Sequence, residues 1–347
     1  MNQPLTREEV IRVIEGKGCA HRVPNAVAPW SDVCLFPNHA EEYNRLMEQY
    51  SCDIEVVRLN MPSVFEGNPN DPSYRWLPFE NPFGPNVSLD AVSAITDMEA
   101  IDEILAAFPD PHSVALISPA PPVGQTYRVA HWWYLLFERF WSLRGMENAL
   151  CDFLEYPDEV HKLFRKLTDF YKVVITRCKT ELQADGIWTS DDIGAQNGPM
   201  FSPTVFREFF KPYYKEIIDH THALGMHFWL HTCGNVQLFL PDLIEIGLDV
   251  IHPIQKYTMD ERRIAEQYGD KICVWAGFDV QQTIPYGTPE QVREEVRFML
   301  DTYFREDGRL IMAAGNNMTC DTPYNSLEAL LDETLSYGTQ KCIEIHK

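Results

Sequence analysis

The stretch HFWLHTCGNV, residues 227–236, decides how this chain folds. Residues 227–231 have the length and apolar character of a buried strand, and the Gly-Asn pair at 234–235 is typical of a turn after it. Because alternate residues of a strand lie on one face, His231 and Cys233 can project together where the strand ends. The stretch therefore predicts a strand that places an imidazole and a thiol side by side.

Similar short runs recur along the chain and alternate with helical patterns. The segments 202–225 (SPTVFREFFKPYYKEIIDHTHALG) and 288–304 (TPEQVREEVRFMLDTYF) are amphipathic, and each opens with Ser or Thr followed by Pro, a favoured helix start. Regular alternation of strands and helices predicts a parallel sheet, and eight repeats predict a single (β/α)8 TIM barrel domain over residues 1–347. The predicted strands are 22–26, 54–58, 114–118, 186–190, 227–231, 249–252, 272–276 and 309–313.

Two segments depart from this alternation. Residues 60–88 are rich in Pro, Asn, Gly and aromatic residues without a sustained period, which predicts a long irregular loop in the N-terminal half. Such a loop is either a lid or binding segment or an ordered surface excursion. The aromatic stripe HWWYLLFERFW, residues 131–141, is interpreted as packing in the core or the barrel wall.

Composition excludes several classes of function. The chain has 347 residues, with 29 Lys and Arg against 51 Asp and Glu, for a formal net charge of -22. So negative a surface repels phosphate backbones and anionic lipid headgroups, which argues against nucleic-acid or membrane partners. The first residues lack the pattern of a signal peptide, and no apolar run could span a bilayer. Nine scattered cysteines without framework spacing predict reduced thiols and a cytoplasmic location.

A second cysteine strengthens the interpretation of His231 and Cys233 as ligands. Cys320 follows the eighth predicted strand, in MAAGNNMTCDTP. The ends of parallel barrel strands meet at one rim, so side chains from the fifth and eighth strands can converge over the barrel axis. One imidazole and two thiolates supply three of the four ligands of a tetrahedral zinc site, and the soft sulfur ligands favour zinc over magnesium or calcium.

Other polar residues follow strands at the same rim. Asp191 and Asp192 come directly after the fourth predicted strand, and either is a candidate catalytic acid, ligand or partner of His231. Strand parity sends the two to opposite faces, so at most one faces the lumen, while the other can cap the following turn. His252, at the end of the sixth strand, and Asn316, after the eighth, are candidate substrate contacts; for His252 a structural, hydrogen-bonded role is equally open.

The chain resembles the uroporphyrinogen decarboxylase superfamily over nearly its whole length. The matching stretches include FSPTVFREFFKPYYKEII, HTCGNV, WAGFDVQQTIPYGTPEQVREEV and GRLIMAAGNNMTCDTPYNSLEAL, in the family's order. The resemblance implies a (β/α)8 barrel. The decarboxylases of this superfamily carry an arginine-rich stretch after the first strand, but here NAVAPWSDVCLFPNHAEEY has no arginine before Arg45.

The chain looks more like the zinc- and corrinoid-dependent methyltransferases of that superfamily. In that branch a His-x-Cys pair and one distant Cys bind zinc, which carries over to His231, Cys233 and Cys320. The resemblance implies transfer of a methyl group between a corrinoid carried by a partner protein and a phenyl methyl ether, a methylamine or a thiol. The alternatives are decarboxylation of a porphyrinogen or another small acid, and a non-catalytic zinc or corrinoid-docking protein.

Overall fold

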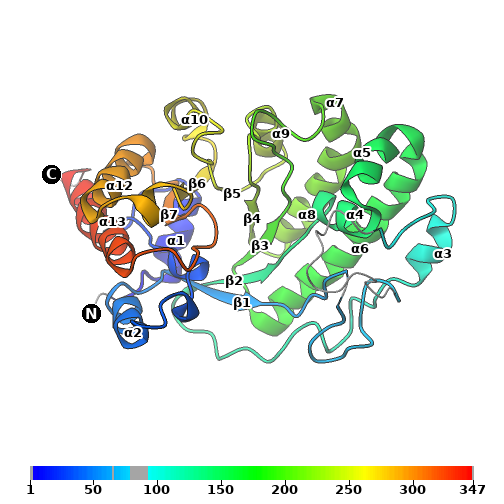
Figure 1. Ribbon diagram of the computed structural model, residues 1–347, viewed down its shortest axis with the longest axis horizontal. Coiled ribbons are helices and arrows are strands. Elements are labelled where there is room, and N and C mark those ends of the chain that lie inside the picture. The colour runs from blue at the N-terminus through cyan, green and yellow to red at the C-terminus, as the bar shows by residue number, and fades with distance from the viewer. Residues whose placement is uncertain (1–2, 65, 79–92, 346–347) are drawn as a thin grey trace.

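A parallel sheet forms the centre of the molecule. The computed structural model describes residues 3–64, 66–78 and 93–345. Within them seven strands are all parallel, and strands that follow one another along the chain are neighbours in the sheet (Figure 1). The predicted alternation of strands and helices is thereby confirmed. The strands are β1 (Ile54–Arg58), β2 (Tyr127–Trp132), β3 (Gly186–Ser190), β4 (His227–His231), β5 (Val250–His252), β6 (Cys273–Phe278) and β7 (Leu310–Ala314).

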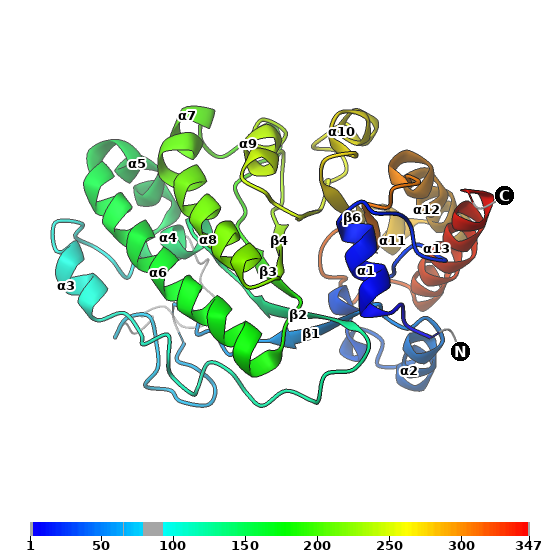
Figure 2. The same cartoon turned by 180° about the vertical axis from the view of Figure 1, so that it is seen from behind.

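Helices flank the sheet on both sides. Figures 1 and 2 show α4 to α8 on one flank and α12 with α13 on the other, with the strands between them. Both predicted Ser/Thr-Pro helix starts are confirmed: the side chains of Ser202 and Thr288 accept hydrogen bonds from Val205 N–H and Gln291 N–H. The helices are α1 (Arg7–Ile14), η1 (Ala28–Trp30), η2 (Val33–Leu35), α2 (Ala40–Gln49), α3 (Ile101–Ala106), α4 (Phe137–Arg144), α5 (Met146–Glu155), α6 (Pro157–Leu182), α7 (Pro203–Val205), the π-helical η4 (Phe206–Phe210), α8 (Lys211–Ala223), α9 (Leu240–Glu245), α10 (Glu261–Tyr268), α11 (Thr283–Tyr286), α12 (Pro289–Tyr303) and α13 (Tyr324–Ile345).

The strand predicted at 114–118 is wrong. These residues form turns, and Val114 is 89% exposed. The second strand is instead β2, whose six residues are all buried between β1 and β3. Residues 114–118 and 127–132 are both apolar runs that could form this strand. Residues 127–132 form it, because they pair with strands on both sides and are buried on both faces. The stripe 131–141 thus begins in β2 and continues into α4.

The strand predicted at 22–26 is reduced to one β-bridge between Asn25 and Met312 of β7. Ala26 N–H donates to Met312 O (2.8 Å), and Met312 N–H donates to Pro24 O (2.9 Å). On the other side Asp53 N–H, just before β1, donates to Asn25 O (2.8 Å). The pairing stops there because Pro24 has no N–H to donate and η1 begins two residues after Ala26.

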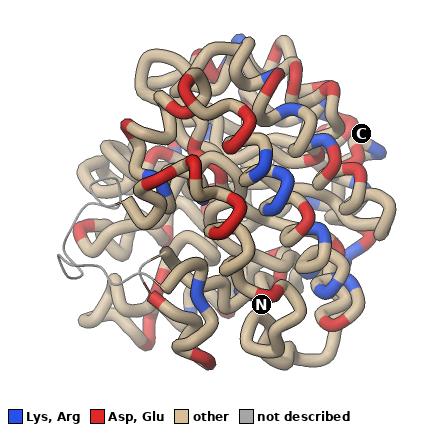
Figure 3. Tube along the Cα trace, turned by 90° about the vertical axis from the view of Figure 1, so that its right-hand side faces the viewer, with Lys and Arg blue, Asp and Glu red and all other residues tan. Residues whose placement is uncertain are grey.

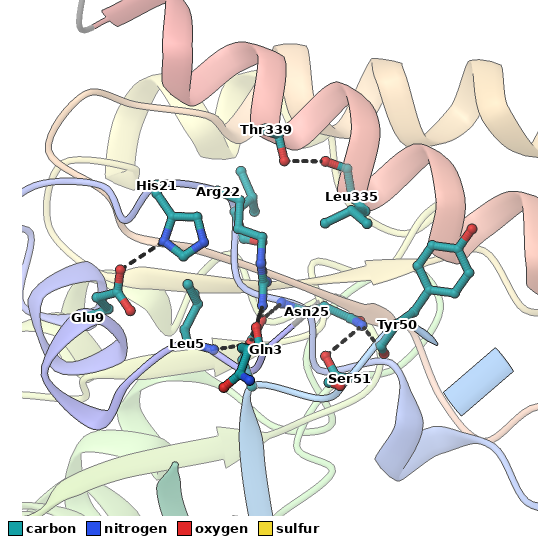
Figure 4. A network of polar contacts seen from close by, with 12 residues as sticks. Gln3, Leu5, Glu9, His21, Arg22, Asn25, Tyr50, Ser51, Leu335 and Thr339 are labelled. Carbon is teal, nitrogen blue, oxygen red and sulfur yellow. Dashed lines mark hydrogen bonds and ion pairs between the residues drawn. The ribbon is translucent and has the colours of Figure 1, made fainter. Parts of the chain in front are cut away.

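Buried charges hold this segment in place. Both oxygens of the Asp53 carboxylate accept from the Arg22 guanidinium (2.6 and 2.7 Å) and from the N–H groups of Leu5 (2.7 Å) and Asn25 (2.6 Å). Figure 4 shows Leu5, Arg22 and Asn25 converging beside the start of β1, with α13 above them. The network ties the N-terminal segment to the edge of the sheet between β7 and β1.

Tryptophan side chains fill the concave side of the sheet. Trp188 of β3 and Trp275 of β6 contact each other at 5.0 Å between ring centroids, although two strands separate them. Neighbouring strands lie about 4.8 Å apart, so a flat sheet would hold these rings about 14 Å apart. Trp30 of η1 contacts both rings. The sheet therefore curls around an aromatic core, and its strand ends face one another across it.

The predicted loop 60–88 is described only in part. Residues 60–64 and 66–78 contain neither helix nor strand, with one isolated bridge between Asn68 and Asp71. Residue 65 and residues 79–88 lie outside the described residues. In the ranges that the structure describes, no helix has the length and apolar character needed to cross a membrane.

Candidate metal centre

Three side chains meet where β3 and β4 end. Ser190 and His231 are partners in the register of these strands, so Asp192 follows β3 beside the place where Cys233 follows β4. His231 Nε2 lies 3.4 Å from Cys233 Sγ and 3.8 Å from Asp192 Oδ1. Within residues 3–64, 66–78 and 93–345, these are the residues whose His, Cys or carboxylate atoms form a metal-compatible group, all within 4.8 Å of one another.

These separations fit a tetrahedral ion. With zinc bonds of about 2.0–2.3 Å to nitrogen, oxygen and sulfur, two ligand atoms lie about 3.5 Å apart. A carboxylate and a thiolate would balance the charge of a divalent ion, and the imidazole adds a neutral ligand. The donor set of one nitrogen, one sulfur and one oxygen suits zinc.

Gly234 lets the loops that follow β3 and β4 approach each other. Its φ is +82°, and a Cβ at this position would lie 2.3 Å from Gly194 C. The loops that follow β3 and β4 are also joined by a bridge between Ala195 and Asn235. Cys233 N–H donates to Asp192 Oδ1 (2.7 Å), which orients that carboxylate toward His231. The Gly-Asn pair after the strand thus brings Asp192 and Cys233 together.

Hydrogen bonds fix the tautomer of His231. His252 Nε2 lies 2.8 Å from the carbonyl oxygen of Ala314, which can only accept, so His252 carries its proton on Nε2. Neutral His252 then offers an Nδ1 lone pair, which accepts from His231 Nδ1–H at 2.7 Å. His231 is left with a bare Nε2 facing Cys233 and Asp192. Such a second hydrogen bond is typical of a metal-binding histidine.

Burial keeps both imidazoles uncharged. Desolvation lowers the pKa of His231. Desolvation also lowers the pKa of His252 well below the usual range, and the neighbouring His231 lowers it further. Burial and then the charge of Asp192 raise the pKa of the Cys233 thiol to about 12. A cation at this position would supply the positive charge that a thiolate requires there.

Asp191 points away from this group. Its carboxylate accepts from the N–H groups of Leu136 (3.1 Å), Phe137 (3.0 Å) and Glu138 (2.7 Å) at the start of α4, and from the Tyr214 hydroxyl (2.6 Å). It is fully buried, and burial raises its pKa to about 6. The predicted division between the two aspartates is therefore seen: Asp192 faces His231, and Asp191 caps a helix. A catalytic role for either stays a prediction.

Cys320 lies outside the group. It is exposed, in a turn in which Thr322 N–H donates to Thr319 O (3.0 Å), and the hydroxyl of Thr319 binds Asp321. Asp192, rather than this cysteine, lies beside His231 and Cys233, and a role of Cys320 as a metal ligand stays a prediction. Strand spacing alone does not tell whether the oxygen of Asp192 or the sulfur of Cys320 lies beside His231, because both residues follow strands that end at the same rim.

The two predicted substrate contacts differ in position. His252 is fully buried behind His231, stacked on Trp30 at 4.4 Å, with both ring nitrogens engaged. Asn316 lies at the surface of a pocket of about 230 Å³ that Cys233 also lines, and its Nδ2 donates to Cys233 Sγ at 3.4 Å. The geometry thus favours the structural alternative for His252 and keeps Asn316 beside the thiol. Contact of either residue with a substrate stays a prediction.

Glu138 belongs to the surroundings of this centre, and sequence reasoning missed it. Its carboxylate binds the Ser190 hydroxyl, and burial raises its pKa well above the usual range, with further contributions from Asp192 and Asp191. The charged pair Glu138-Arg139 inside the aromatic stripe 131–141 was the signal that could have identified it. Charged side chains are rarely buried in a helix without a partner.

Comparison with known proteins finds similarity to a family model, to a sequence relative and to a solved structure. The family model described as uroporphyrinogen decarboxylase (URO-D) matches residues 140–337. A methylated-thiol–coenzyme M methyltransferase of Methanosarcina mazei is 22% identical over 187 residues, which are 54% of this chain and 47% of that protein. The match thus spans about half the length of this relative. A solved structure of a methyltransferase from Methanosarcina mazei superposes with a TM-score of 0.63 at 15% identity, covering 95% of this chain and 98% of the other.

Proposed function

Because this chain belongs to the uroporphyrinogen decarboxylase family, and because the ends of β3 and β4 bring His231, Cys233 and Asp192 close enough together to hold a metal ion, we propose that it is a zinc-dependent methyltransferase. The observation that carries the proposal is the bare Nε2 of His231 beside Cys233 Sγ and Asp192 Oδ1. The two methyltransferases of Methanosarcina mazei, one similar in sequence and one in fold, support the same class of reaction.

In the proposed reaction a methyl group passes between a small molecule and a corrinoid on a separate protein. Zinc bound here would act as a Lewis acid toward the sulfur, oxygen or nitrogen of the small molecule. The corrinoid, held by its own protein, would supply the metal that gives or takes the methyl group. His231, Cys233 and Asp192 would hold the zinc, which would favour the thiolate form of a thiol acceptor or polarise the oxygen of an ether donor.

The residues around the centre position and polarise rather than react. His252 and the Ala314 carbonyl hold the imidazole of His231 in one tautomer. The Cys233 N–H holds Asp192, and Asn316 donates to the Cys233 sulfur, which moderates its charge. The small molecule enters through the pocket lined by Cys233 and Asn316. The corrinoid protein docks over the same rim.

We extend the proposal to the fold and the location. Segment 22–26 takes the place of the eighth strand of a (β/α)8 barrel, supported by its hydrogen bonds to β7 and to Asp53. The chain forms a single domain. It works in the cytoplasm, supported by nine cysteines that are all free of disulfides.

Metal analysis of the purified chain tests the function. We expect one zinc per chain, lost in Cys233→Ala and in His231→Ala. Cys320→Ala separates two ligand sets: it retains zinc if Asp192 is the third ligand, and loses zinc if the turn that carries Cys320 rearranges. Zinc-loaded protein mixed with a methylated corrinoid protein and a panel of thiols, methylamines and methoxyaromatics should change the cobalt absorption spectrum. Metal-free protein that decarboxylates a porphyrinogen would instead support the decarboxylase alternative.

A further inference from the structure

A second pocket opens at the ends of β1 and β2. It has a volume of about 480 Å³, and its lining includes Arg58, Met61, His131, Trp133 and Arg139. Arg58 and His131 are register partners in the two strands, so the pocket lies at the same rim as the candidate metal centre. Tyr134 and Trp132 complete an aromatic wall. Nothing in the proposed chemistry of the metal centre uses this pocket.

The pocket is positively charged on a strongly negative molecule. Its described lining contains two arginines and no carboxylate. Neither Arg58 nor Arg139 takes part in any of the ion pairs found among the described residues. The chain as a whole has a net charge of -22, and Figure 3 shows acidic residues on many separate elements. Two unpaired guanidinium groups at one pocket therefore attract anions that the rest of the surface repels.

Arg139 is buried and takes part in no ion pair among the described residues. Its side chain is 1% exposed, and neither Nε nor Nη1 has a hydrogen-bond partner among the described residues. The guanidinium packs over Trp76 (4.3 Å) and Tyr134 (5.3 Å). Its neighbour Glu138 binds Ser190 instead. A buried charge without a partner is costly, so an arginine at this position is better explained by a ligand that supplies the missing anion.

His131 offers the pocket an acceptor. Its Nδ1–H donates to the Trp188 carbonyl (3.0 Å), so Nε2 carries a lone pair, and that atom has no partner among the described residues. The ring stacks on Trp188 at 3.8 Å and is almost completely buried. The pocket thus combines cationic donors, one neutral acceptor and flat aromatic walls.

One indole ring connects the pocket with the metal centre. Trp133 meets the ring of His131 edge-on at 4.4 Å, and it meets the ring of His231 edge-on at 5.7 Å. A planar molecule that packs against Trp133 therefore lies within about one ring width of the Asp192, His231 and Cys233 group. This is the range over which a methyl-bearing substituent of a small aromatic molecule can reach from an anchored carboxylate.

We propose that this pocket binds a small aromatic carboxylate, with the ring against Trp133 and the carboxylate at Arg139 and Arg58. The carboxylate supplies the counter-charge of the two guanidinium groups, and the ring fills the aromatic walls. A hydroxyl or methoxyl substituent of the ring then lies toward His131 or toward the metal centre. The identification of this molecule as the substrate rests on the proposed function, whereas its binding does not.

Binding to metal-free protein tests the pocket on its own. Quenching of tryptophan fluorescence is titrated with benzoate and 3-hydroxybenzoate, and with benzamide as the uncharged control. We expect benzoate to bind at least about tenfold more tightly than benzamide, because a hydrogen bond between charged groups is stronger than one to a neutral amide. Arg139→Met removes this preference, and Arg58→Met reduces it without placing the buried core at risk. Arg45→Met, at an arginine whose side chain is 71% exposed, leaves it unchanged.

A second measurement separates ligand binding from a structural role. Removing an uncompensated buried charge should leave the melting temperature of ligand-free Arg139→Met unchanged or raised, while abolishing the rise that benzoate gives the wild type. A melting temperature lowered together with weaker benzamide binding would show that Arg139 serves packing. Equal affinity for benzoate and benzamide in the wild type, or an equal loss in Arg45→Met, overturns the proposal. Tight benzoate binding without methyl transfer by zinc-loaded protein leaves the pocket standing and contradicts the proposed function alone.

Discussion

His231 owes its bare nitrogen to a backbone carbonyl three strands away. Ala314 ends β7, His252 ends β5 and His231 ends β4, and two hydrogen bonds of 2.8 and 2.7 Å connect them. The carbonyl oxygen can only accept a hydrogen bond, so it determines which nitrogen of His252, and in turn which nitrogen of His231, carries the proton. A fixed tautomer is worth more at a metal site than a strong base, because a ligand needs a free lone pair at one defined atom.

Replacing His252 should weaken zinc binding without removing a ligand. In His252→Phe the aromatic contact with Trp30 is kept, but His231 Nδ1–H loses its acceptor. We expect zinc affinity to fall by about 10- to 100-fold, the range typical for loss of a hydrogen-bonded partner of a ligand. Competition with a chromophoric chelator measures the affinity.

The control for this variant is His252→Asn, whose amide oxygen can accept from His231 and should restore part of the affinity. Zinc affinity unchanged in His252→Phe would show that the tautomer of His231 is fixed by the metal alone.

The individual residues of the centre were predictable from the sequence only where a strand supplies the spacing. The period of two places His231 and Cys233 on one face, and parity separates Asp191 from Asp192. Whether Cys320 lies near His231 and Cys233 depends on its distance from them across the rim, and that distance depends on how the turn from Thr319 to Thr322 folds. Glu138 and Arg139 stand out as a charged pair inside an aromatic stripe, but their neighbours in space come from other parts of the chain, so the local pattern does not reveal what they contact.

Among the structural elements, β1 depends on the N-terminal segment through Asp53. This carboxylate is fully buried and binds the guanidinium of Arg22, which is 4% exposed. Asp53→Asn leaves that cation without its partner, and breaking a buried pair in this way costs about 3–5 kcal/mol. Urea denaturation should show a loss of stability in this range, with Arg22→Met giving a comparable loss.

The double variant Arg22→Met/Asp53→Asn shows whether the two residues act as a pair. We expect its loss of stability to be smaller than the sum of the single losses, because the second change no longer strands a charge. Additive losses would contradict the assignment of this network as the connection between the N-terminal segment and β1.

The contact between α8 and the start of β5 should make stability depend on pH. His222 Nε2 lies 2.8 Å from Asp249 Oδ2, and the hydrogen bond to Asp249 raises the pKa of His222. The folded-state pKa of His222 thus lies above its unfolded value of about 6.5. The contact therefore stabilises the fold fully below about pH 6.5, and this stabilisation is lost as the pH rises through the folded-state pKa. Since His222 is partly exposed, the contribution is at most about 1 kcal/mol.

His222→Gln measures this contribution. The variant should be less stable than the wild type at pH 5.5, and the difference should shrink by pH 8.5, as measured by urea denaturation at both values. A difference that is the same at both pH values would show that the loss comes from packing rather than from the ion pair.

The elements themselves were predictable where period and length agree. The Ser/Thr-Pro starts of α7 and α12 have a local cause in helix capping, and the strands from β3 onward lie between clear helices. The choice between 114–118 and 127–132 was not local, because both runs are apolar and only pairing with β1 and β3 separates them. Segment 22–26 has the composition of a strand, but Pro24 and η1 limit it to one bridge.

On the scale of the whole molecule, the candidate centre draws on strands that also form the core. Asp192, His231 and Cys233 extend from β3 and β4, and in the aromatic interior His252 stacks on Trp30 and contacts the tilted ring of Trp275. In the proposed single domain, the metal would bind within the common core. Zinc binding should therefore stabilise the entire chain as one body rather than a part of it.

Thermal unfolding of metal-free protein should show one transition, and zinc should move it as a whole. Zinc at about 100 times its dissociation constant adds about 2.7 kcal/mol to the stability of the folded state. With an unfolding entropy of about 2.1 cal/mol/K per residue, a chain of 347 residues gains about 4 °C. Cys233→Ala should abolish the shift, and Cys151→Ala, which changes an exposed cysteine on α5, should retain it. Two separate transitions, of which zinc moves only one, would contradict the single domain, because a metal that joins β3 to β4 in one cooperative core cannot stabilise half of it.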